Sequence, residues 1–234
     1  MKQALDRFEI KRQIVNNGGL LAVVTVVVVV TVAKVCLVAS GPELDPDAYA
    51  HAIAGRRMLK NWRDISVHWV WLPLSHVVYA VLARFGQGIQ AFRVLNVVLS
   101  AVTPLVVFAT WGSSADSADE GPLHSRVVPA IAAIIVAIDP MGLWLSESGQ
   151  MESAFQFLTV LACGAWLRRR PALSAVALSA AVLLRYEAWV FAGAFALIAI
   201  LQHSRYRAWY FVAFLPGITV LSWILLHYRA TGEL

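Results

Sequence analysis

Long apolar runs, separated by short polar segments, make up most of the chain. The first run extends from about Gly19 to Ser40 and contains a single charged residue, Lys34. A membrane-spanning helix needs ~20 predominantly apolar residues, and a helix satisfies its own backbone groups in lipid. Strands of a membrane barrel alternate apolar and polar residues, which these runs do not. Further runs cover 93–111, 126–137, 151–167 and 210–228, and a helical hairpin covers 171–203.

The pattern therefore predicts an all-α fold, a polytopic membrane bundle of about seven transmembrane helices. The polar stretch 41–92 is predicted to be a long first loop that contains two amphipathic helices. Residues 71–83 are apolar but too short for a span, so we interpret them as an amphipathic or re-entrant helix. The alternative is a short true span, which would invert the sidedness of everything that follows.

The distribution of basic residues predicts which ends of the helices face the cytoplasm. Lys and Arg accumulate in cytoplasmic loops, and here they precede the first span and recur at 168–170 and 204–207. We therefore expect a cytoplasmic N-terminus, an outer C-terminus, and a cytoplasmic loop at 112–125. The first loop, the segment 138–153 and the hairpin turn 185–189 should then share the outer face.

Composition supports the membrane interpretation and excludes several other classes. The 234 residues are 59% hydrophobic, which is more than soluble domains use. The net charge of +5 comes from residues at helix ends and does not indicate nucleic-acid binding. Cys36 and Cys163 lie in apolar runs and predict neither a disulfide framework nor a metal site. We expect a single transmembrane domain, 1–234, in the cytoplasmic membrane, with no separate soluble domain.

The predicted outer face collects many ionisable residues from separate segments: Asp45, Asp47, Tyr49, His51, Arg56, Arg57, Lys60, Arg63, His68, His76, Asp139, Glu147, Glu152, Arg185, Tyr186 and Glu187. Structural interpretations exist for some of them. The basic run 56–63 could lie on anionic headgroups, and Arg185 with Glu187 could be an interfacial ion pair. A single histidine such as His76 is usually an interface residue, and its spacing from His68 is not that of a zinc-binding helix.

The convergence of these residues nevertheless favours function, because ionisable groups near the membrane are costly. Arginine binds phosphate through its planar fork of donors, and a neighbouring carboxylate suits general-base work. The residues thus predict an anionic lipid substrate and removal of a proton from an acceptor hydroxyl.

Several segments, in order, resemble the GT-C membrane glycosyltransferases. The first loop, DPDAYAHAIAGRRML, resembles the acidic motif and following helix of that family. Further resemblances are WLPLSHVVYAVLARFG, QAFRVLNVVLS, SESGQMESAFQFLTVLA, ALSAAVLLRYEAW and HYRATGEL. Together they cover about 20–234. The relatives in question include protein O-mannosyltransferases, lipid A aminoarabinose transferases and mycobacterial arabinofuranosyltransferases, which share a seven-span module.

The resemblance implies an inverting sugar transfer from a polyprenyl-phosphate donor to a hydroxyl of a glycan, lipid or protein acceptor at the outer face. Asp47 would be the general base, with Asp45 as the alternative, because different relatives place the acid at different spacings from the Tyr. The lipid phosphate would be held by Arg56, Arg57, Arg185 and Arg93. Ligands or arginines would be oriented by Tyr49, Glu152 and Glu187. Some relatives bind a divalent metal near the acids, but nothing in the sequence requires one or any other cofactor.

The chain is shorter than these relatives, which continue for several more spans. It could be a minimal enzyme, a truncated form, or one that needs a protein partner for the missing C-terminal part. The main alternative function is a non-catalytic, lipid-phosphate-binding or scaffold subunit of a glycan-assembly complex. A transporter is disfavoured because no inverted pair of broken helices is found.

Overall fold

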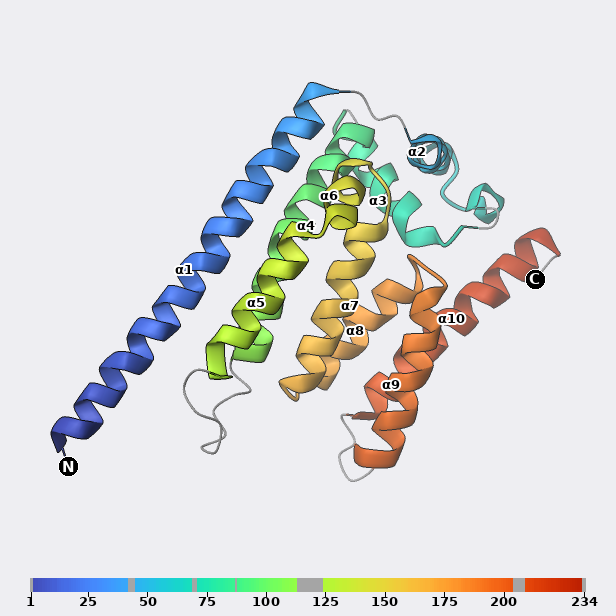
Figure 1. Ribbon diagram of the computed structural model, residues 1–234. Helices are drawn as coiled ribbons and strands as arrows, with labels where there is room; N and C mark the ends of the chain where they lie inside the picture. Colours follow the sequence, from blue (N-terminus) through green and yellow to red (C-terminus); the bar gives the residue numbers. More distant parts are fainter. Residues whose placement is uncertain are drawn as a thin grey trace.

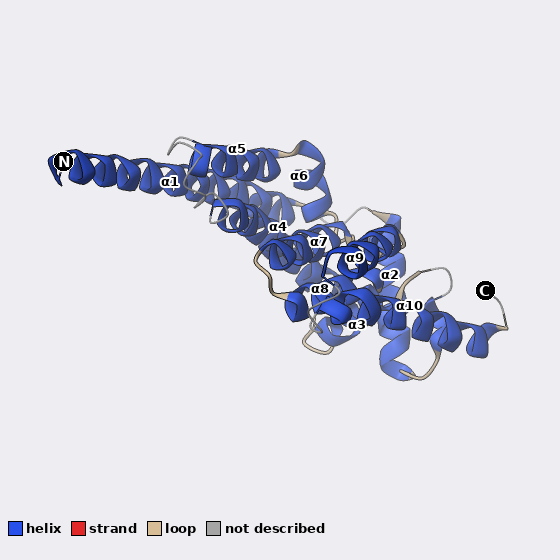
Figure 2. Cartoon of the chain, turned by 90° about the horizontal axis from the view of Figure 1, so that it is seen from below, coloured by secondary structure: helices blue, strands red, loops and turns tan. Residues whose placement is uncertain are grey.

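A computed structural model describes residues 2–41, 45–68, 71–86, 88–112, 124–203 and 209–232. These residues form helices and no strand, as the sequence predicts (Figures 1 and 2). The helices are α1 (Lys2–Ser40), α2 (Pro46–Lys60), the short 3-10 helix η1 (Ile65–His68), α3 (Pro73–Ala83), α4 (Gly88–Gly112), α5 (His124–Ile138), α6 (Pro140–Glu147), α7 (Glu152–Leu167), α8 (Pro171–Val182), α9 (Glu187–His203) and α10 (Tyr210–Thr231).

Within the described residues, three helices are long and apolar enough to cross a membrane. These are Asn17–Ser40 of α1, Gly88–Trp111 of α4, and α10. The pair Val127–Ile138 and Pro140–Glu147, bent by 51°, would make a fourth if it is one span. Helices α7, α8 and α9 are apolar but shorter. The long helices indicate association with a membrane, whereas the number of seven spans and their sidedness stay predictions.

The helices form an elongated row rather than a ring (Figure 2). Helix α4 packs against α1, α5 and α7; α7 then packs on α8, α8 on α10, and α10 on α9. Helices α2 and α3 pack on each other beside the first residues of α4 (Figure 1). The segments predicted to face outward thus lie at the same ends of the helices, the upper ends in Figure 1, which we call the loop end: the end of α1, the α2–α3 pair, α6, and the α8–α9 turn.

The basic segment 168–170 lies at the opposite end, where Arg168 donates a hydrogen bond to the carbonyl of Ala109 near the end of α4. The basic segment 168–170 and the first loop thus lie at opposite ends of the helices, and the side of the membrane that each faces stays a prediction. Two other segments from which sidedness is predicted are 112–125 and 204–207. Residues 113–123 of the first and all of the second lie outside the described residues.

Arg93 fixes three helices at the loop end. Its side chain is 1% exposed, and Nε donates to the Glu147 carbonyl at 2.6 Å. Nη1 donates to the Gly41 carbonyl at 2.9 Å, and Nη2 pairs with Glu147 Oε2 at 2.9 Å. A buried guanidinium satisfied in this way connects the end of α1, α4 and α6. Arg93 therefore has a structural role in this fold.

Helices α2 and α3 cross closely because Gly55 has no side chain. A Cβ atom at Gly55 would lie 2.6 Å from Tyr79 Cβ and 3.0 Å from the backbone nitrogen of Ala80. Both helices begin with proline, Pro46 and Pro73, whose missing N–H would be unpaired there in any case. The buried face of α3 carries Ser75, His76 and Tyr79, so its polar side chains point inward, toward α2 and the bundle.

Replacing Gly55 with alanine should separate these two helices. We expect a free energy of unfolding lower by about 1–3 kcal/mol, because the new methyl group meets backbone that cannot yield easily. Thermal unfolding in detergent checks this. The matched control is Gly193→Ala in α9, where nothing lies within 4 Å of the added Cβ and stability should be unchanged or raised. Equal stability of both variants would contradict the close crossing.

Candidate functional site

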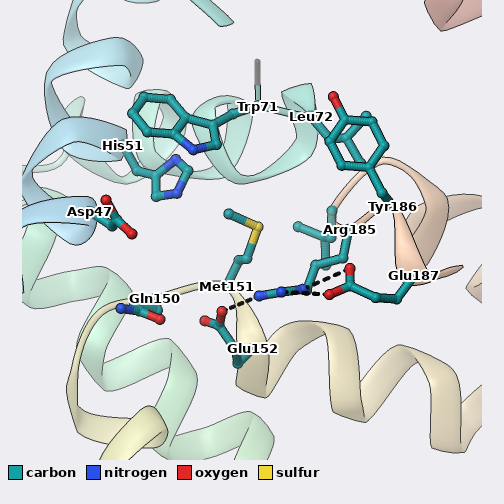
Figure 3. Close-up of a pocket in the computed structure, with 11 residues that line it drawn as sticks. Asp47, His51, Trp71, Leu72, Gln150, Met151, Glu152, Arg185, Tyr186 and Glu187 are labelled. Atoms are coloured by element: carbon teal, nitrogen blue, oxygen red, sulfur yellow. Dashed lines mark hydrogen bonds and ion pairs between the residues drawn. The ribbon is translucent and has the colours of Figure 1, made fainter. Parts of the chain in front are cut away.

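A cavity of about 330 Å³ opens at the loop end (Figure 3). Asp47 and His51 of α2 and Trp71 before α3 line one side, and Arg185, Tyr186 and Glu187 of the α8–α9 turn line the other. Gln150, Met151 and Glu152 lie between them, where α7 begins. The cavity therefore joins side chains from four separate segments of the sequence.

The two aspartates of the first loop have different environments. Asp45 is the N-cap of α2: its Oδ1 accepts hydrogen bonds from the backbone nitrogens of Asp47 at 2.8 Å and Ala48 at 3.4 Å. Its Oδ2 accepts a hydrogen bond from Gln150. Asp47 is exposed, lines the cavity, and has no side-chain hydrogen bond within the described residues. Of the two, Asp47 has the carboxylate available to a ligand.

Arg185 is the single arginine among the residues that line this cavity, and two carboxylates hold it. Its Nε and Nη2 bind the Glu187 carboxylate at 3.1 and 2.7 Å, and Nη1 pairs with Glu152. Hydrogen bonds to Glu187 raise the pKa of Arg185 above its usual value, so the guanidinium stays cationic. The Glu187 side chain is 57% exposed and that of Glu152 is 22% exposed. The pair with Glu187 is thus the more solvated of the two.

The same three residues, Glu152, Arg185 and Glu187, also line a second cavity of about 430 Å³. Its other lining residues include Asp139, Phe155 and Gln156. The ion-pair group therefore stands between two cavities, one bounded by the α2–α3 pair and the other by α6 and α7.

Five of the predicted site residues, Asp45 among them, line neither cavity. Arg56 and Arg57 are exposed on the face of α2 that points away from α3, and Tyr49 is 46% exposed. Arg93 is buried in its structural contacts with Glu147 and Gly41. The structure thus brings together Asp47, Glu152, Arg185 and Glu187, with Asp45 adjacent through Gln150.

Three buried histidines lie directly behind the cavity. His51 Nδ1 is 2.8 Å from His76 Nε2, and His76 Nδ1 is 2.6 Å from His68 Nδ1. Trp71 packs on the first ring, with centroids 4.6 Å apart, and Trp223 of α10 meets His68 edge-on at 5.3 Å. Burial lowers the pKa of His51 and His68 to about 4, and that of His76 to about 3. All three rings are therefore neutral at pH 7.

The histidine cluster should make stability depend on pH. Because the folded-state pKa values lie below the usual ~6.5, the stability is complete above about pH 6.5 and decreases as the pH falls toward 4. Asp45, Asp47 and Asp64 oppose this effect by attracting a proton to the rings, whereas His227 adds to it.

At pH 5 we expect a loss of about 2 kcal/mol for each histidine, and less than the sum because the three interact. Thermal unfolding in detergent at pH 7.5 and pH 5 measures the loss. The His51→Gln variant should lose less stability than the wild type over the same interval. An identical pH dependence would show that the cluster does not titrate in this way.

The described residues do not provide a metal site. They contain no group of three or more His, Cys, Asp or Glu arranged to hold an ion. The carboxylate of Asp45 is committed to the start of α2 and to Gln150, so it does not pair with Asp47 around a cation. The divalent metal that the family resemblance raises therefore does not fit these two residues.

The sequence places His51 and Tyr186 among the outer-face residues but assigns them no role, and it does not single out Trp71 or Gln150. His51 follows Asp47 by four positions, which places both on one face of α2, so helical spacing could have identified it. No local signal identifies Gln150, because its position depends on how α7 meets α2. No protein-family model matches the chain, and no curated protein sequence matches it significantly.

Proposed function

We propose that the protein is a membrane glycosyltransferase of the GT-C type, which transfers a sugar from a polyprenyl-phosphate donor to a hydroxyl acceptor at the outer face of the membrane. One observation carries the proposal. The carboxylate of Asp47, which has no hydrogen bond within the described residues, shares a cavity with the cation Arg185 at the end of the bundle where apolar helices would leave the membrane. The order of sequence motifs supports the same family.

The roles follow from the chemistry of each group. Asp47 takes the proton of the acceptor hydroxyl as its oxygen attacks the anomeric carbon, and the phosphate leaves with the polyprenol. Arg185 binds the phosphate oxygens, since a guanidinium fork fits them. Glu187 is the carboxylate that the phosphate replaces, because its ion pair is more exposed than that of Glu152. Glu152 keeps the guanidinium oriented.

The two cavities offer separate approaches for the two substrates. The cavity that includes Phe155 and Asp139 adjoins α6 and α7, and we assign the lipid donor to it. The cavity that includes Asp47 and Trp71 receives the acceptor. The ion-pair group between them is where the phosphate and the acceptor hydroxyl would meet.

The test is sugar transfer by the purified chain in proteoliposomes, with a panel of radiolabelled polyprenyl-phosphate sugars and mixed glycan, lipid and peptide acceptors. We expect transfer from at least one lipid-linked donor, with release of polyprenyl phosphate, and none from nucleotide sugars. Binding of polyprenyl phosphate without transfer from any donor would overturn the catalytic proposal and favour a lipid-phosphate-binding subunit of a glycan-assembly complex.

A further inference from the structure

The three histidines behind the cavity form a continuous hydrogen-bonded chain. His76 is 0% exposed and lies in the middle, and each of its ring nitrogens faces a nitrogen of a neighbouring imidazole. His51 lies at the cavity, and His68 lies at the far end, against α10. Three separate elements, α2, η1 and α3, supply one ring each.

The arrangement suits proton transfer better than simple packing. A neutral imidazole has one N–H donor and one bare nitrogen acceptor, so a row of neutral rings has two equivalent hydrogen-bonding directions. When the first ring takes up a proton and the last ring releases one, the row shifts from one direction to the other and every ring stays neutral. Both ends of His76 are engaged, which leaves no other donor or acceptor on that ring. Trp71 and Trp223 cover the outer rings.

A further imidazole, that of His227, lies near the His68 end of the three histidines and can accept a proton there. His227 of α10 follows Trp223 by one turn, with ring centroids 5.6 Å apart. Its Nδ1 is buried and has no hydrogen-bond partner among the described residues, although the residue as a whole is partly exposed. His227 is also near enough to His68 to interact with it electrostatically. A proton that reaches His68 therefore has a route toward the surface of α10.

We propose that His51, His76 and His68 form a proton relay that carries the acceptor proton from Asp47 to the α10 side of the protein. This inference rests on the proposed function. The acceptor O–H bond breaks as its oxygen bonds to the sugar, the phosphate takes the electron pair of the broken sugar–oxygen bond, and Asp47 holds the proton.

The relay then returns Asp47 to its carboxylate form. Asp47 passes its proton to His51 Nε2, and His51 Nδ1–H passes its proton to His76 Nε2. His76 Nδ1–H then passes its proton to His68 Nδ1, and His68 Nε2–H releases one toward His227 and solvent. One proton leaves and no charge remains; each ring is left with its proton on the other nitrogen, and proton exchange with water resets the tautomers before the next turnover.

The first test does not depend on activity. Protein labelled with ¹⁵N at its six histidines is reconstituted in lipid, and solid-state NMR records the imidazole nitrogens at pH 7. We expect three neutral rings with ¹⁵N–¹⁵N couplings across two hydrogen bonds, and both couplings should vanish in His76→Gln. Absence of the couplings, or an imidazolium among these rings at pH 7, would overturn the relay.

The second test separates a relay from a structural role. Glutamine at position 76 retains a donor and an acceptor but cannot pass a proton on. We expect His76→Gln to keep most of its thermal stability and to transfer sugar about 10–100-fold more slowly at saturating substrate, within the range of proton-transfer contributions. Unchanged transfer in this variant would overturn the proposal.

Chemical rescue distinguishes proton transfer by the His76 ring from a role in which the ring only fills space. His76→Ala leaves a cavity of imidazole size, and added imidazole should restore transfer, whereas 1-methylimidazole, which has no N–H, should not. Equal rescue by both compounds would show that the ring only fills space. If the wild type transfers no sugar from any donor, the proposed function fails, and the NMR measurement still decides whether the histidine chain exists.

Discussion

Replacing Asp47 with asparagine is expected to reduce sugar transfer by about 10²–10⁴-fold, the usual contribution of a general base. The Asp47 side chain makes no hydrogen bond within the described residues, so the change should hardly affect folding. The loss of an acidic group from the first turn of α2 removes only about 0.3–1 kcal/mol of helix-dipole interaction. The measurement is the transfer rate at saturating donor, together with the thermal midpoint of the same preparation.

Asp45→Asn is the matched control, because it makes the same chemical change two residues earlier. Asparagine also caps helices well through Oδ1, its Nδ2 then faces Gln150, and the Gln150 amide can reverse its orientation so that Oε1 accepts a hydrogen bond from Nδ2. We therefore expect transfer within a few-fold of the wild type. If Asp45→Asn loses transfer and Asp47→Asn does not, the base is Asp45, and its hydrogen bonds to α2 and Gln150 would have to open during the reaction. If both variants transfer sugar as fast as the wild type, neither aspartate of this loop is the general base.

The helical class and the positions of most elements follow from the hydrophobic pattern. The apolar run at 19–40 corresponds to the apolar part of α1, Asn17–Ser40, although the helix itself begins at Lys2. The runs at 126–137 and 210–228 correspond to α5 and α10 within a few residues. Helix α4 begins at Gly88, five residues before the predicted start of the span at Arg93. Residues 88–92 are helical as well, but they are less apolar than the span, so the hydrophobic pattern does not include them. The predicted short helix at 71–83 is found as α3, which begins at Pro73.

The site was only partly predictable, because charge alone does not show which way a helix face points. Arg56, Arg57 and Arg185 carry the same charge. Only Arg185 lines the cavity, because α3 packs on one face of α2 and Arg56 and Arg57 are exposed on the opposite face. Gly55 and the buried His51 determine which face of α2 packs against α3. Neither is an apolar residue, so the hydrophobic pattern does not mark that face as buried. The family resemblance implies that Arg93 binds the phosphate, and no local signal shows its structural role, because its partners, a carbonyl at the end of α1 and Glu147, are distant in the sequence.

The arrangement of the three buried histidines was likewise not predictable from the sequence. His51, His68 and His76 have no recognised spacing, and each is ordinary when considered alone. Only the crossing of α2 over α3 and the turn of η1 bring their ring nitrogens within 3 Å of one another. A hydrogen-bonded chain is a tertiary property, and no periodicity within one helix encodes it.

Replacing Arg185 with methionine is expected to abolish sugar transfer and to lower stability. The methionine keeps much of the apolar stem but leaves Glu152 and Glu187 without their cation. Removing one partner of a buried ion pair costs about 3–5 kcal/mol, whereas exposed pairs contribute about 0–1 kcal/mol. Arg185 is 30% exposed, so we expect an intermediate loss of about 2 kcal/mol. Transfer rates and thermal unfolding are measured on the same proteoliposomes or detergent preparations.

Two further variants separate the two effects of this change. Combining Arg185→Met with Glu152→Gln and Glu187→Gln removes the unpaired charges, and we expect it to recover stability but not transfer. Arg57→Met is the matched control at an exposed arginine of α2, and it should leave both quantities unchanged. Recovery of transfer in the triple variant would exclude Arg185 as the phosphate ligand. A loss of transfer in Arg57→Met would instead place the phosphate on the basic face of α2, where the arginines of the first loop meet solvent rather than the cavity.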